Sequence, residues 1–551
     1  MENMRKKWMS FALVGALAVS SLGLVVGDAQ AKKPNQSANN NGKVKNVIML
    51  VMDGSSDDLS TLARWYKGED LALDSILTGG VKTYSAESAI TDSAPAATAL
   101  ATGNKANTGN VGVLPSLVTT PGVEQVANED IHKPVANVLE GAKLDGKATG
   151  IVSSSEIQHA TPAGFSAHVV KRSNYDDIAE QQVYQNMDVV LGGGYNSLNE
   201  KRKDGENLLE VIDNKGYDYV TNRNELLSTD SEKIWGSFAP SALAYDVDRQ
   251  TTKPEEPTLA EMTEKAINTL SQDKDGFFLM VEGSKIDWAA HANDPIGMIS
   301  DFLAFDDAVS KALEFAEKDK NTLVIALTDH GNSGITIGNH NTNSNYDTTP
   351  VFAYIDPLKE ATMTLEGALS LLKEDQSNLV EVAGLYGLTN LTDKEKAALE
   401  SSEKLSATMV QLLAERANIG FTTGGHTGED VFLYSYGPSK PTGLVDNTDI
   451  AHTMAKAMGF DLDKLSNEIF VNAEQSFKEA GYTTKIDTTD AANPVFIAEN
   501  KNKIVTIPEN KNIVIVENKN NNKVETHEFK TVTVFNDKQF FISEEMFKRA
   551  K

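Results

Sequence analysis

The sequence of 551 residues contains no cysteine. Disulfides are therefore excluded in any compartment, and so are thiolate zinc sites and cysteine nucleophiles. Any metal site must use histidine, carboxylate and hydroxyl ligands. Stability must come from the hydrophobic core and from bound metal.

Positive charge is scarce: 51 lysines and arginines oppose 78 aspartates and glutamates, so the formal net charge is −27. A chain of this charge repels polyanions at long range, and we expect no nucleic-acid binding. An anionic substrate would need local cations to overcome the same field. Bound metal ions would supply them.

Long apolar runs are also rare. The first 31 residues combine a basic start, an apolar run over 11–26 and Ala-Gln-Ala before Lys32, which is the layout of a secretory signal. The run is shorter than the roughly 20 residues that a membrane span needs. We predict a signal peptide over 1–31, a flexible leader over 32–44, no membrane span, and a product that is extracellular, periplasmic or associated with the cell surface.

Short apolar runs alternate with helical patterns along most of the chain. The runs predicted as strands lie at 45–52, 149–153, 188–191, 276–281, 322–327, 350–354 and 431–434. The helical patterns lie at 131–144, 258–271, 295–318 and 405–416. This order predicts an α/β three-layer sandwich with a large, mostly parallel central sheet.

Two regions differ from this pattern. Residues 358–417 are rich in Leu, Ala, Glu and Lys, which predicts a helical insertion at one edge of the sheet. From residue 487 onward, Asn/Lys-rich turns separate short alternating strands at 503–507, 512–516, 524–534 and 539–542. We therefore predict an α/β domain over 45–486 and a small antiparallel β-module over 487–551, which is a candidate for contact with the cell envelope.

Acidic and histidine side chains follow several predicted strands, at the sheet edge where parallel α/β proteins bind ligands. The residues that follow strands closely are Asp53, Glu282, Asp329 and His330. Asp287 and His291 are four residues apart, so on a helix both would face one cation. His426 lies in a glycine-flanked loop. Any one of these could be an ordinary surface or turn residue, but the chain has only nine histidines, and their joint placement predicts a multinuclear metal site.

Ser93 is predicted to begin a helix. Asp92 can cap this helix, Pro95 suits its first turn, and Gly103 can end it. The Ser93 hydroxyl would then lie at the positive end of the helix dipole, which favours an alkoxide or a phosphoserine. Without the metal groups, Ser93 would be interpreted as a capping residue only.

Six separated motifs together resemble the alkaline phosphatase family. In chain order they are Val-Met-Asp53-Gly, Thr-Asp-Ser93-Ala, Ala-Thr161-Pro-Ala with His-Val-Val-Lys-Arg172, Val-Glu282-Gly with Ile-Asp287 and His291, Thr-Asp329-His330, and Gly-Gly-His426-Thr-Gly. The motifs extend from about residue 45 to residue 460. The resemblance implies an enzyme that hydrolyses small phosphomonoesters through a phosphoserine at Ser93 and releases inorganic phosphate.

The resemblance also implies two Zn²⁺ ions and one Mg²⁺ ion. The first zinc would be held by Asp287, His291 and His426. The second zinc would be held or faced by Asp53, Asp329, His330 and Ser93. Magnesium would be held by Asp53, Thr161 and Glu282. Arg172 would bind two phosphate oxygens with its planar guanidinium.

Two positions depart from the best-known bacterial pattern of this family. His159 and Trp288 stand where that form has an aspartate and a lysine. These two residues therefore bear on the identity of the third metal, the rate of phosphate release and the pH optimum. We interpret His159 as acting on the third metal through a water rather than as a direct ligand. A homodimer is compatible with the sequence.

Two other functions account for parts of the sequence. A phosphodiesterase or sulfatase of the same superfamily would share the metal ligands at the strand ends. However, the residues after Ser93 lack the arginine of a sulfatase motif, and the His-x-x-x-Arg172 context favours a monoester. A nonenzymatic envelope protein is the third reading, and the complete ligand set argues against it.

Overall fold

The computed structural model of the protein describes residues 44–199 and 201–551. The predicted signal peptide over 1–31 and all but the last residue of the predicted leader lie outside the described residues. None of the helices in the described part of the chain combines the length and the apolar composition that a membrane span requires.

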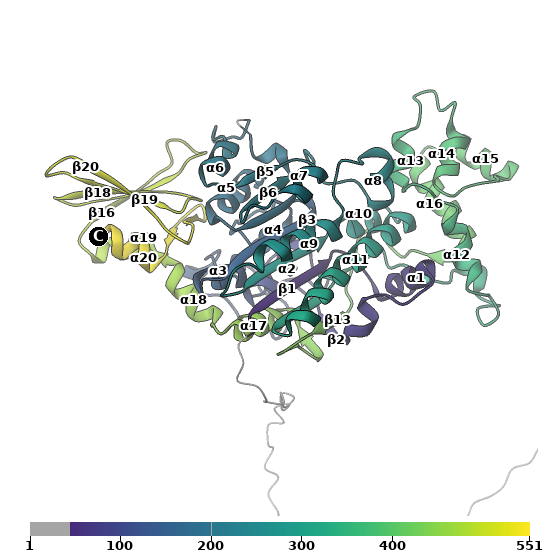
Figure 1. The fold of residues 1–551 in the computed structure, drawn as a ribbon, viewed down its shortest axis with the longest axis horizontal. Helices are drawn as coiled ribbons and strands as arrows, with labels where there is room; N and C mark the ends of the chain where they lie inside the picture. Colours follow the sequence, from purple (N-terminus) through teal and green to yellow (C-terminus); the bar gives the residue numbers. More distant parts are fainter. Residues whose placement is uncertain (1–43, 200) are drawn as a thin grey trace, which may run out of the picture. The chain divides into compact units, whose positions relative to one another are not determined.

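Ten strands form one sheet, in the order β14-β2-β13-β8-β1-β7-β3-β4-β6-β5. Neighbouring strands are parallel, except that β13 is antiparallel to both β2 and β8. The strands are β1 (Asn46–Met52), β2 (Leu77–Lys82), β3 (Ala148–Glu156), β4 (Val189–Gly193), β5 (Asp218–Val220), β6 (Ile234–Ser237), β7 (Phe277–Gly283), β8 (Thr322–Leu327), β13 (Val431–Tyr436) and β14 (Gly443–Asp446). The predicted large, mostly parallel sheet is confirmed (Figure 1).

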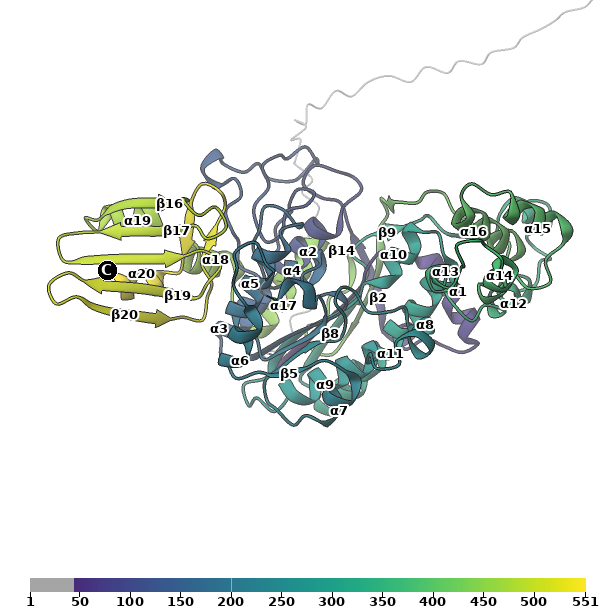
Figure 2. The ribbon, with the colours of Figure 1, turned by 90° about the horizontal axis from the view of Figure 1, so that it is seen from above.

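The sheet is covered on both faces. All seven residues of β1 are buried, and successive side chains alternate between two cores: Ile48 and Leu50 belong to one, Val47 and Met49 to the other. This is the alternation of a strand buried on both sides. Figure 2 shows α9 and α11 on one side of the strands and α2, α4 and α17 on the other. The three-layer architecture is therefore confirmed.

Helices on each face contribute their apolar residues to one of the two cores. The helices that pack into the core of Ile48 are α1 (Asp57–Lys67), α7 (Arg223–Ser228), α8 (Asp246–Thr252), α9 (Leu259–Leu270), α10 (Lys285–His291) and α11 (Pro295–Asp319). Those that pack into the core of Val47 are α2 (Ser93–Thr102), α3 (Val138–Leu144), α5 (Tyr175–Gln185), α6 (Leu208–Asn214), α17 (Asn447–Met458) and α18 (Leu462–Ile469). The short helix α4 (Ala160–Gly164) packs on α2 through small residues, since a Cβ on Gly164 would lie 2.6 Å from that of Ala97.

The predicted helical insertion is confirmed, and Figure 1 shows its helices gathered in one green group. The helices are α12 (Phe352–Lys359), α13 (Leu365–Ser370), α14 (Leu379–Leu385), α15 (Asp393–Glu400) and α16 (Leu405–Arg416). The short strands β10 (Thr336–Ile337) and β11 (Ile419–Gly420) pair at its base. The strand predicted at 350–354 is wrong, because this run opens α12. Tyr354, Ile355 and Leu358 are buried at helical spacing, and a short apolar run alone does not distinguish a helix from a strand.

The helix predicted at 131–144 is shorter than expected. Only its second half is helical, as α3, and Asn137 begins this helix with a capping box to Glu140. Pro134 upstream pairs with Val113 as an isolated β-bridge. Proline lacks the N–H that a helix interior uses, so the segment before the cap remains extended.

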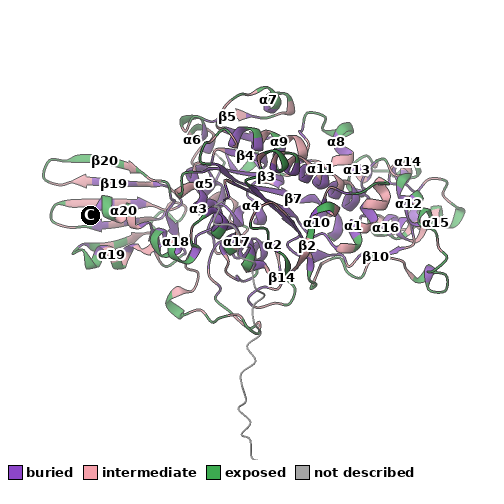
Figure 3. Ribbon diagram, turned by 60° about the horizontal axis from the view of Figure 1, so that its bottom comes forward, coloured by how far each residue is buried: buried purple, intermediate pink, exposed green. Residues whose placement is uncertain are grey.

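The C-terminal part of the chain forms two small antiparallel sheets. The larger sheet consists of β16 (Thr483–Asp487), β17 (Val495–Glu499), β18 (Lys503–Pro508), β19 (Ile513–Asn518) and β20 (Lys523–Glu528). The smaller sheet consists of β15 (Val471–Asn472), β22 (Phe540–Ile542) and β21 (Val534–Phe535). The helices α19 (Ala473–Glu479) and α20 (Glu544–Ala550) share their core. The antiparallel character is confirmed, whereas the domain boundary at 487 stays a prediction. Figure 3 shows the edge strand β20 mostly exposed.

Candidate active site

Carboxylates collect at the carboxyl ends of three neighbouring strands. Asp53 directly follows β1, Glu282 lies near the end of β7 opposite Val51, and Asp329 follows β8. Because these strands are parallel, their carboxyl ends meet at one edge of the sheet. All three side chains are buried, so residues separated by more than 200 positions surround one small volume.

The first group of potential ligands is Asp53, Asp329 and His330, whose donor atoms lie within 4.8 Å of one another. His330 Nε2 is 3.5 Å from Asp53 Oδ1 and 3.3 Å from Asp329 Oδ2. Ser93 Oγ is 3.2 Å from the same Nε2 atom. Helix α2 begins at Ser93, as the sequence predicts, so this hydroxyl lies at the helix N-terminus beside a dense cluster of acids.

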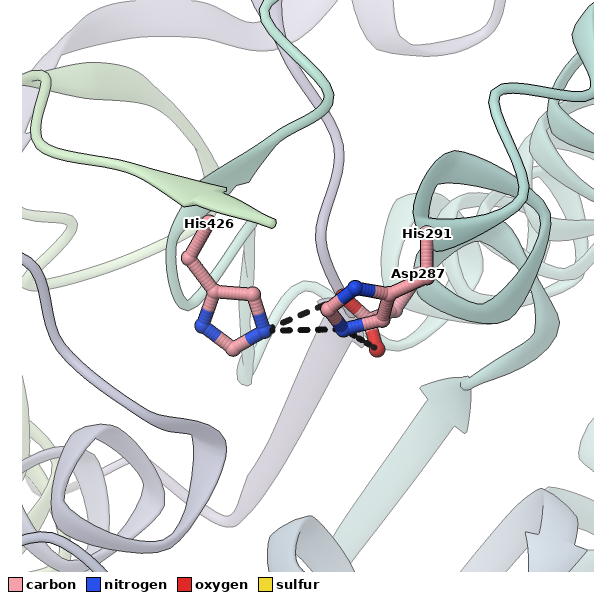
Figure 4. A group of neighbouring side chains, drawn as sticks. All are labelled: Asp287, His291 and His426. Atoms are coloured by element: carbon pink, nitrogen blue, oxygen red, sulfur yellow. Dashed lines mark hydrogen bonds and ion pairs between the residues drawn. The ribbon is translucent and has the colours of Figure 1, made fainter. Parts of the chain in front are cut away.

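The second group is Asp287, His291 and His426 (Figure 4). Asp287 and His291 lie one turn apart on α10, and His426 comes from the short strand β12 (His426–Thr427), which pairs with β9 (Gly331–Asn332). His291 Nε2 is 3.5 Å from Asp287 Oδ2, and His426 Nε2 is 3.6 Å from Asp287 Oδ1. The His426 ring stacks on that of His330 with centroids 3.7 Å apart, so the two groups adjoin.

The three histidines of these two groups have the same hydrogen-bonding arrangement. Each Nδ1 atom lies within hydrogen-bond distance of a backbone carbonyl: His291 with Gly424 at 3.0 Å, His330 with Gly331 at 3.3 Å, and His426 with Thr91 at 2.8 Å. A carbonyl only accepts, so each Nδ1 carries the proton and each Nε2 keeps a lone pair. Metal-binding histidines are commonly fixed in this way.

The third group is Asp53, Glu282 and His159, again with donor atoms within 4.8 Å of one another. His159 Nε2 bonds Arg172 at 3.0 Å, whereas its Nδ1 atom is buried and without a hydrogen-bond partner among the described residues. A ring nitrogen of His159 therefore lies close to the carboxylates of this group, and the water-mediated role of His159 stays a prediction. Thr161 Oγ1, the hydroxyl that the family resemblance implies here, is likewise buried and unpartnered in the described structure.

The electrostatics of these groups favour bound cations. Burial, and then the neighbouring carboxylates, raise the pKa of Asp53 well above its ordinary value, and burial raises the pKa of Glu282 and Asp329 as well. Both oxygens of Asp53, Asp329 Oδ2 and Glu282 Oε1 have no hydrogen-bond partner in the described part of the chain. Buried carboxylates without partners are costly unless a cation neutralises them. The donor set of carboxylates, imidazoles and a hydroxyl therefore fits the divalent zinc and magnesium ions that the sequence predicts.

Arg172 lies next to the predicted nucleophile. One guanidinium nitrogen donates to Asp92 Oδ1 at 2.6 Å, and another lies 3.0 Å from His159 Nε2. Burial, and then Arg172 itself, lower the pKa of His159 to about 4, so this ring is neutral and accepts the hydrogen bond. The rings of His159 and Trp288 also meet edge to face, with centroids 5.9 Å apart. The guanidinium is thus fixed from two sides.

Asp92 is a residue whose role the sequence interpretation missed. It occupies the capping position of α2, but its side chain makes no capping hydrogen bond and instead contacts Arg172 and the backbone N–H of Gly109. The sequence did contain a signal for this role. Asp92 immediately precedes Ser93, and Arg172 was expected to bind phosphate next to Ser93.

Two further polar side chains support the ligands and were also missed. Asn332 Nδ2 donates to Asp287 Oδ1 at 2.7 Å, and Ser153 Oγ donates to Glu282 Oε2 at 2.5 Å. Ser153 lies opposite Glu282 in the β3–β7 register, so the predicted parallel sheet contained the signal for it. Asn332 follows His330 by two residues, where a turn was expected.

Comparison with known proteins agrees with this geometry. The family model for alkaline phosphatase matches residues 44–460. Alkaline phosphatase 3 of Bacillus subtilis is 35% identical over 489 residues, which cover 84% of this chain and 99% of that protein. The repressible alkaline phosphatase of Saccharomyces cerevisiae is 31% identical over 520 residues, covering 82% of this chain and 87% of that protein.

Solved structures show the same relationship. The crystal structure of Thermus thermophilus alkaline phosphatase matches with a TM-score of 0.66 and 28% identity, covering 76% of this chain and 92% of that one. A mutant of the TAB5 alkaline phosphatase, with Mg bound in its M3 site, matches with a TM-score of 0.55 and 27% identity. The match covers 76% of this chain and 99% of that one. The chain therefore belongs to the alkaline phosphatase family and, like the relatives that bear this name, is a phosphoric monoester hydrolase.

Proposed function

We propose that this chain is a metal-dependent phosphate monoesterase in which Ser93 is the covalent nucleophile. The observation that carries the proposal is the position of Ser93 Oγ, at the N-terminus of α2 and 3.2 Å from His330 Nε2. A hydroxyl there adjoins a set of buried, unpartnered carboxylate oxygens. Such an arrangement favours activation of the hydroxyl by bound cations.

Two Zn²⁺ ions and one Mg²⁺ ion fit the donor groups. One zinc would be held by Asp287, His291 and His426. The other zinc would be held by Asp53, Asp329 and His330, next to Ser93. Magnesium would be held by Asp53, Glu282 and Thr161, with His159 acting through a water. When bound, these cations would lower the pKa of the Ser93 hydroxyl and neutralise charge on the phosphoryl oxygens.

The remaining steps, binding of the phosphoryl group and its transfer, are carried out by side chains of this protein. Arg172 binds two nonbridging phosphoryl oxygens with its planar fork, and Asp92 and neutral His159 fix the direction of that fork. Ser93 Oγ forms a bond to phosphorus while the bond between phosphorus and the alcohol oxygen breaks, and the alcohol leaves. Water then attacks the phosphoserine, inorganic phosphate is released, and Ser93 Oγ regains a proton. Positioning and charge neutralisation are the main requirements of phosphoryl transfer.

The test is a Ser93→Ala variant of the metal-loaded protein, assayed with phenyl phosphate at alkaline pH. We expect kcat to fall by about 10³-fold or more, because removal of a covalent nucleophile leaves only the stabilisation from the rest of the site. A quenched reaction with a radiolabelled monoester should label Ser93 in the natural chain and no residue in the variant. Ser435→Ala, which changes another buried serine far along the sheet, is the matched control and should retain activity.

Two results would contradict the proposal. Label on a residue other than Ser93 would assign the nucleophile elsewhere. Faster hydrolysis of bis-phenyl phosphate than of phenyl phosphate would favour the phosphodiesterase alternative, which shares the metal groups but differs in the groups that hold the substrate.

Export and domain organisation belong to the same proposal. The basic, apolar and Ala-x-Ala layout of residues 1–31 supports secretion. We also propose that residues 45–486 form the catalytic domain and residues 487–551 a separate module. The five-stranded antiparallel sheet, with a core around Phe496 and Val514, supports a separate C-terminal module, although β16 and the core residue Phe477 lie before residue 487.

A further inference from the structure

The turn between β18 and β19 is a buried contact surface rather than a free hairpin loop. Asn510 and Asn512 in this turn are 3% and 1% exposed, whereas Asn522, in the next turn of the same sheet, is exposed. A hairpin amide normally bonds to water. Asn512 bonds Glu528 and the Phe529 carbonyl at the end of β20 in its own sheet. The partners of Asn510 lie on α5, so the burial of Asn510 indicates that this turn is docked on another part of the chain.

The turn docks on α5 and on the loop that leads into α6. Lys511 Nζ lies 3.3 Å from Glu180 Oε1 and 3.0 Å from Glu206 Oε2. These two acids and Asp204 have carboxylate oxygens within 4.8 Å of one another. Lys511 thus supplies positive charge to Glu180 and Glu206, while Arg202 pairs with Asp204.

Asn510 extends this contact to the backbone of the main domain. Its Oδ1 accepts from Gln181 Nε2 at 2.9 Å, and its Nδ2 donates to Glu180 at 3.0 Å. Gln181, which is 1% exposed, brackets the backbone of His168: Nε2 donates to the His168 carbonyl at 3.0 Å, and Oε1 accepts from the His168 N–H at 2.7 Å. Asn510 therefore completes the hydrogen bonding of the side chain that holds His168.

His168 begins the five-residue segment that ends at Arg172. One edge of this segment is paired with residues 109–112, through the Val111–Val169 bridge and through a bond from the Arg172 N–H to the Gly109 carbonyl at 2.8 Å. Gln181 holds the start of the segment from the side of α5. A cavity of about 320 Å³ lies between residues 168–171 and the C-terminal module, and both Gln181 and Asn510 line it.

We propose that Asn510 is a positioning residue for phosphate binding: it fixes Gln181, and through Gln181 the segment that carries Arg172. This inference rests on the proposed role of Arg172 in binding phosphate. Without the Asn510 side chain, one N–H of buried Gln181 has no acceptor, which is costly. Gln181 is then expected to turn toward another partner and release the His168 backbone. The C-terminal module is thus part of the phosphate site rather than an accessory.

The experiment compares two asparagines in the same backbone conformation. Asn510 has φ of 59° and Asn522 has φ of 53°, so glycine replaces either without backbone strain. In the full metal-loaded chain, Asn510→Gly should raise KM for phenyl phosphate and Ki for inorganic phosphate by about 3- to 10-fold, within the range seen for coupling through intermediate residues. Asn522→Gly should change neither constant. If Asn510→Gly does not fold, Asn510→Ser keeps an oxygen acceptor with a shorter reach and should give a smaller rise in the same two constants.

A double-mutant cycle separates positioning from general stability. In an Arg172→Ala background, Asn510→Gly should cause no further rise in Ki, because the group that it positions is already gone. An equal rise in both backgrounds, or an unchanged Ki with Arg172 present, would overturn the inference. If Arg172→Ala itself leaves Ki unchanged, the failure is in the proposed role of Arg172 instead.

Discussion

Glu140 and His168 form a buried pair beneath the segment that carries Arg172. His168 Nε2 is 3.0 Å from Glu140 Oε1, and both side chains are almost fully buried. Burial alone would lower the pKa of His168, but the Glu140 carboxylate raises it above its ordinary value. Burial alone would raise the pKa of Glu140, but His168 and several hydrogen bonds hold it below its ordinary value.

Because of this pair, the free energy of unfolding is expected to fall both at high pH, where His168 loses its proton, and at low pH, where Glu140 gains one. The stability from His168 is present below its ordinary pKa of about 6.5 and is lost as pH rises through the raised value. The stability from Glu140 is present above its ordinary pKa and is lost as pH falls through the lowered value. Glu140→Gln should therefore reduce the free energy of unfolding by about 2–4 kcal/mol near pH 6 and by less at pH 9, measured by urea denaturation.

The control for this prediction is Glu474→Gln, which removes one partner of the exposed i,i+4 pair with Lys478. Exposed pairs contribute little, so its effect should be small at both pH values. A loss from Glu140→Gln that is the same at pH 6 and pH 9 would show that the pair is not charged near neutrality.

Single residues were predictable where their chemistry is nearly unique. The sequence contains few histidines, so His291, His330 and His426 could be singled out as potential ligands before their neighbours were known. Asp92 could not be assigned in the same way, because a carboxylate beside a helix start has several partners within reach. Only the fold decides that it bonds Arg172 instead of its own helix.

At the scale of elements, the turn after β1 depends on close backbone approach. Gly54 has φ of 67°, and a Cβ there would lie 2.3 Å from Asp287 Oδ1 and 2.6 Å from Asp287 Cβ. Gly54→Ala should therefore displace Asp287 and weaken zinc binding by about 10-fold or more, in addition to about 1–2 kcal/mol of backbone strain. Competition with a chelator of known affinity measures the change.

Gly68→Ala is the matched control. Gly68 has φ of 81° at the end of α1, but a Cβ there would meet nothing within 4 Å. Both variants carry the backbone strain, and only Gly54→Ala carries the clash. Equal zinc affinity in the two variants would contradict the proposed importance of the close approach.

Elements were predicted best where they are buried on both faces. The apolar runs of β1, β7 and β8 are continuous, because such strands pack against helices above and below. The run at 350–354 is also apolar but leads into the first turn of α12, and the next buried positions, Ile355 and Leu358, lie beyond the run. The run was therefore too short to show the helical spacing of its buried residues.

At the scale of the whole molecule, the metal groups join segments from early and late parts of the chain. Asp53 comes from the first strand of the chain and His426 from a segment that precedes β13. Removal of metal by a chelator should abolish phosphatase activity and lower Tm, because buried carboxylates are left facing one another. A cation at 1,000 times its Kd stabilises by about 4 kcal/mol.

Readdition of Zn²⁺ and Mg²⁺ should restore both activity and Tm, followed by differential scanning fluorimetry. A chelated protein with an unchanged Tm would show that these groups contribute nothing to metal-linked stability. The variant Asp329→Asn is the control, because it removes a charge from the cluster and should reduce the difference in Tm between the chelated and reloaded forms.

The convergence of the acidic and histidine side chains at the strand ends was predictable from the sequence, because the carboxyl ends of parallel strands meet at one edge of the sheet. The docking of the β18–β19 turn on α5 was not. Asn510 and Gln181 are 329 residues apart, and no periodic pattern relates a hairpin turn to a helix at that distance.

The exposed edge of the five-stranded sheet bears on how molecules behave when they are crowded together. An edge strand presents unpaired N–H and C=O groups that another copy could use to extend the sheet. Five of the six residues of β20 are exposed, and Lys523, Glu525 and Glu528 place charges along it. Pairing of a second copy with β20 would remove water from these charges, which is costly. The charges on β20 therefore oppose the growth of intermolecular β-sheets in a concentrated solution.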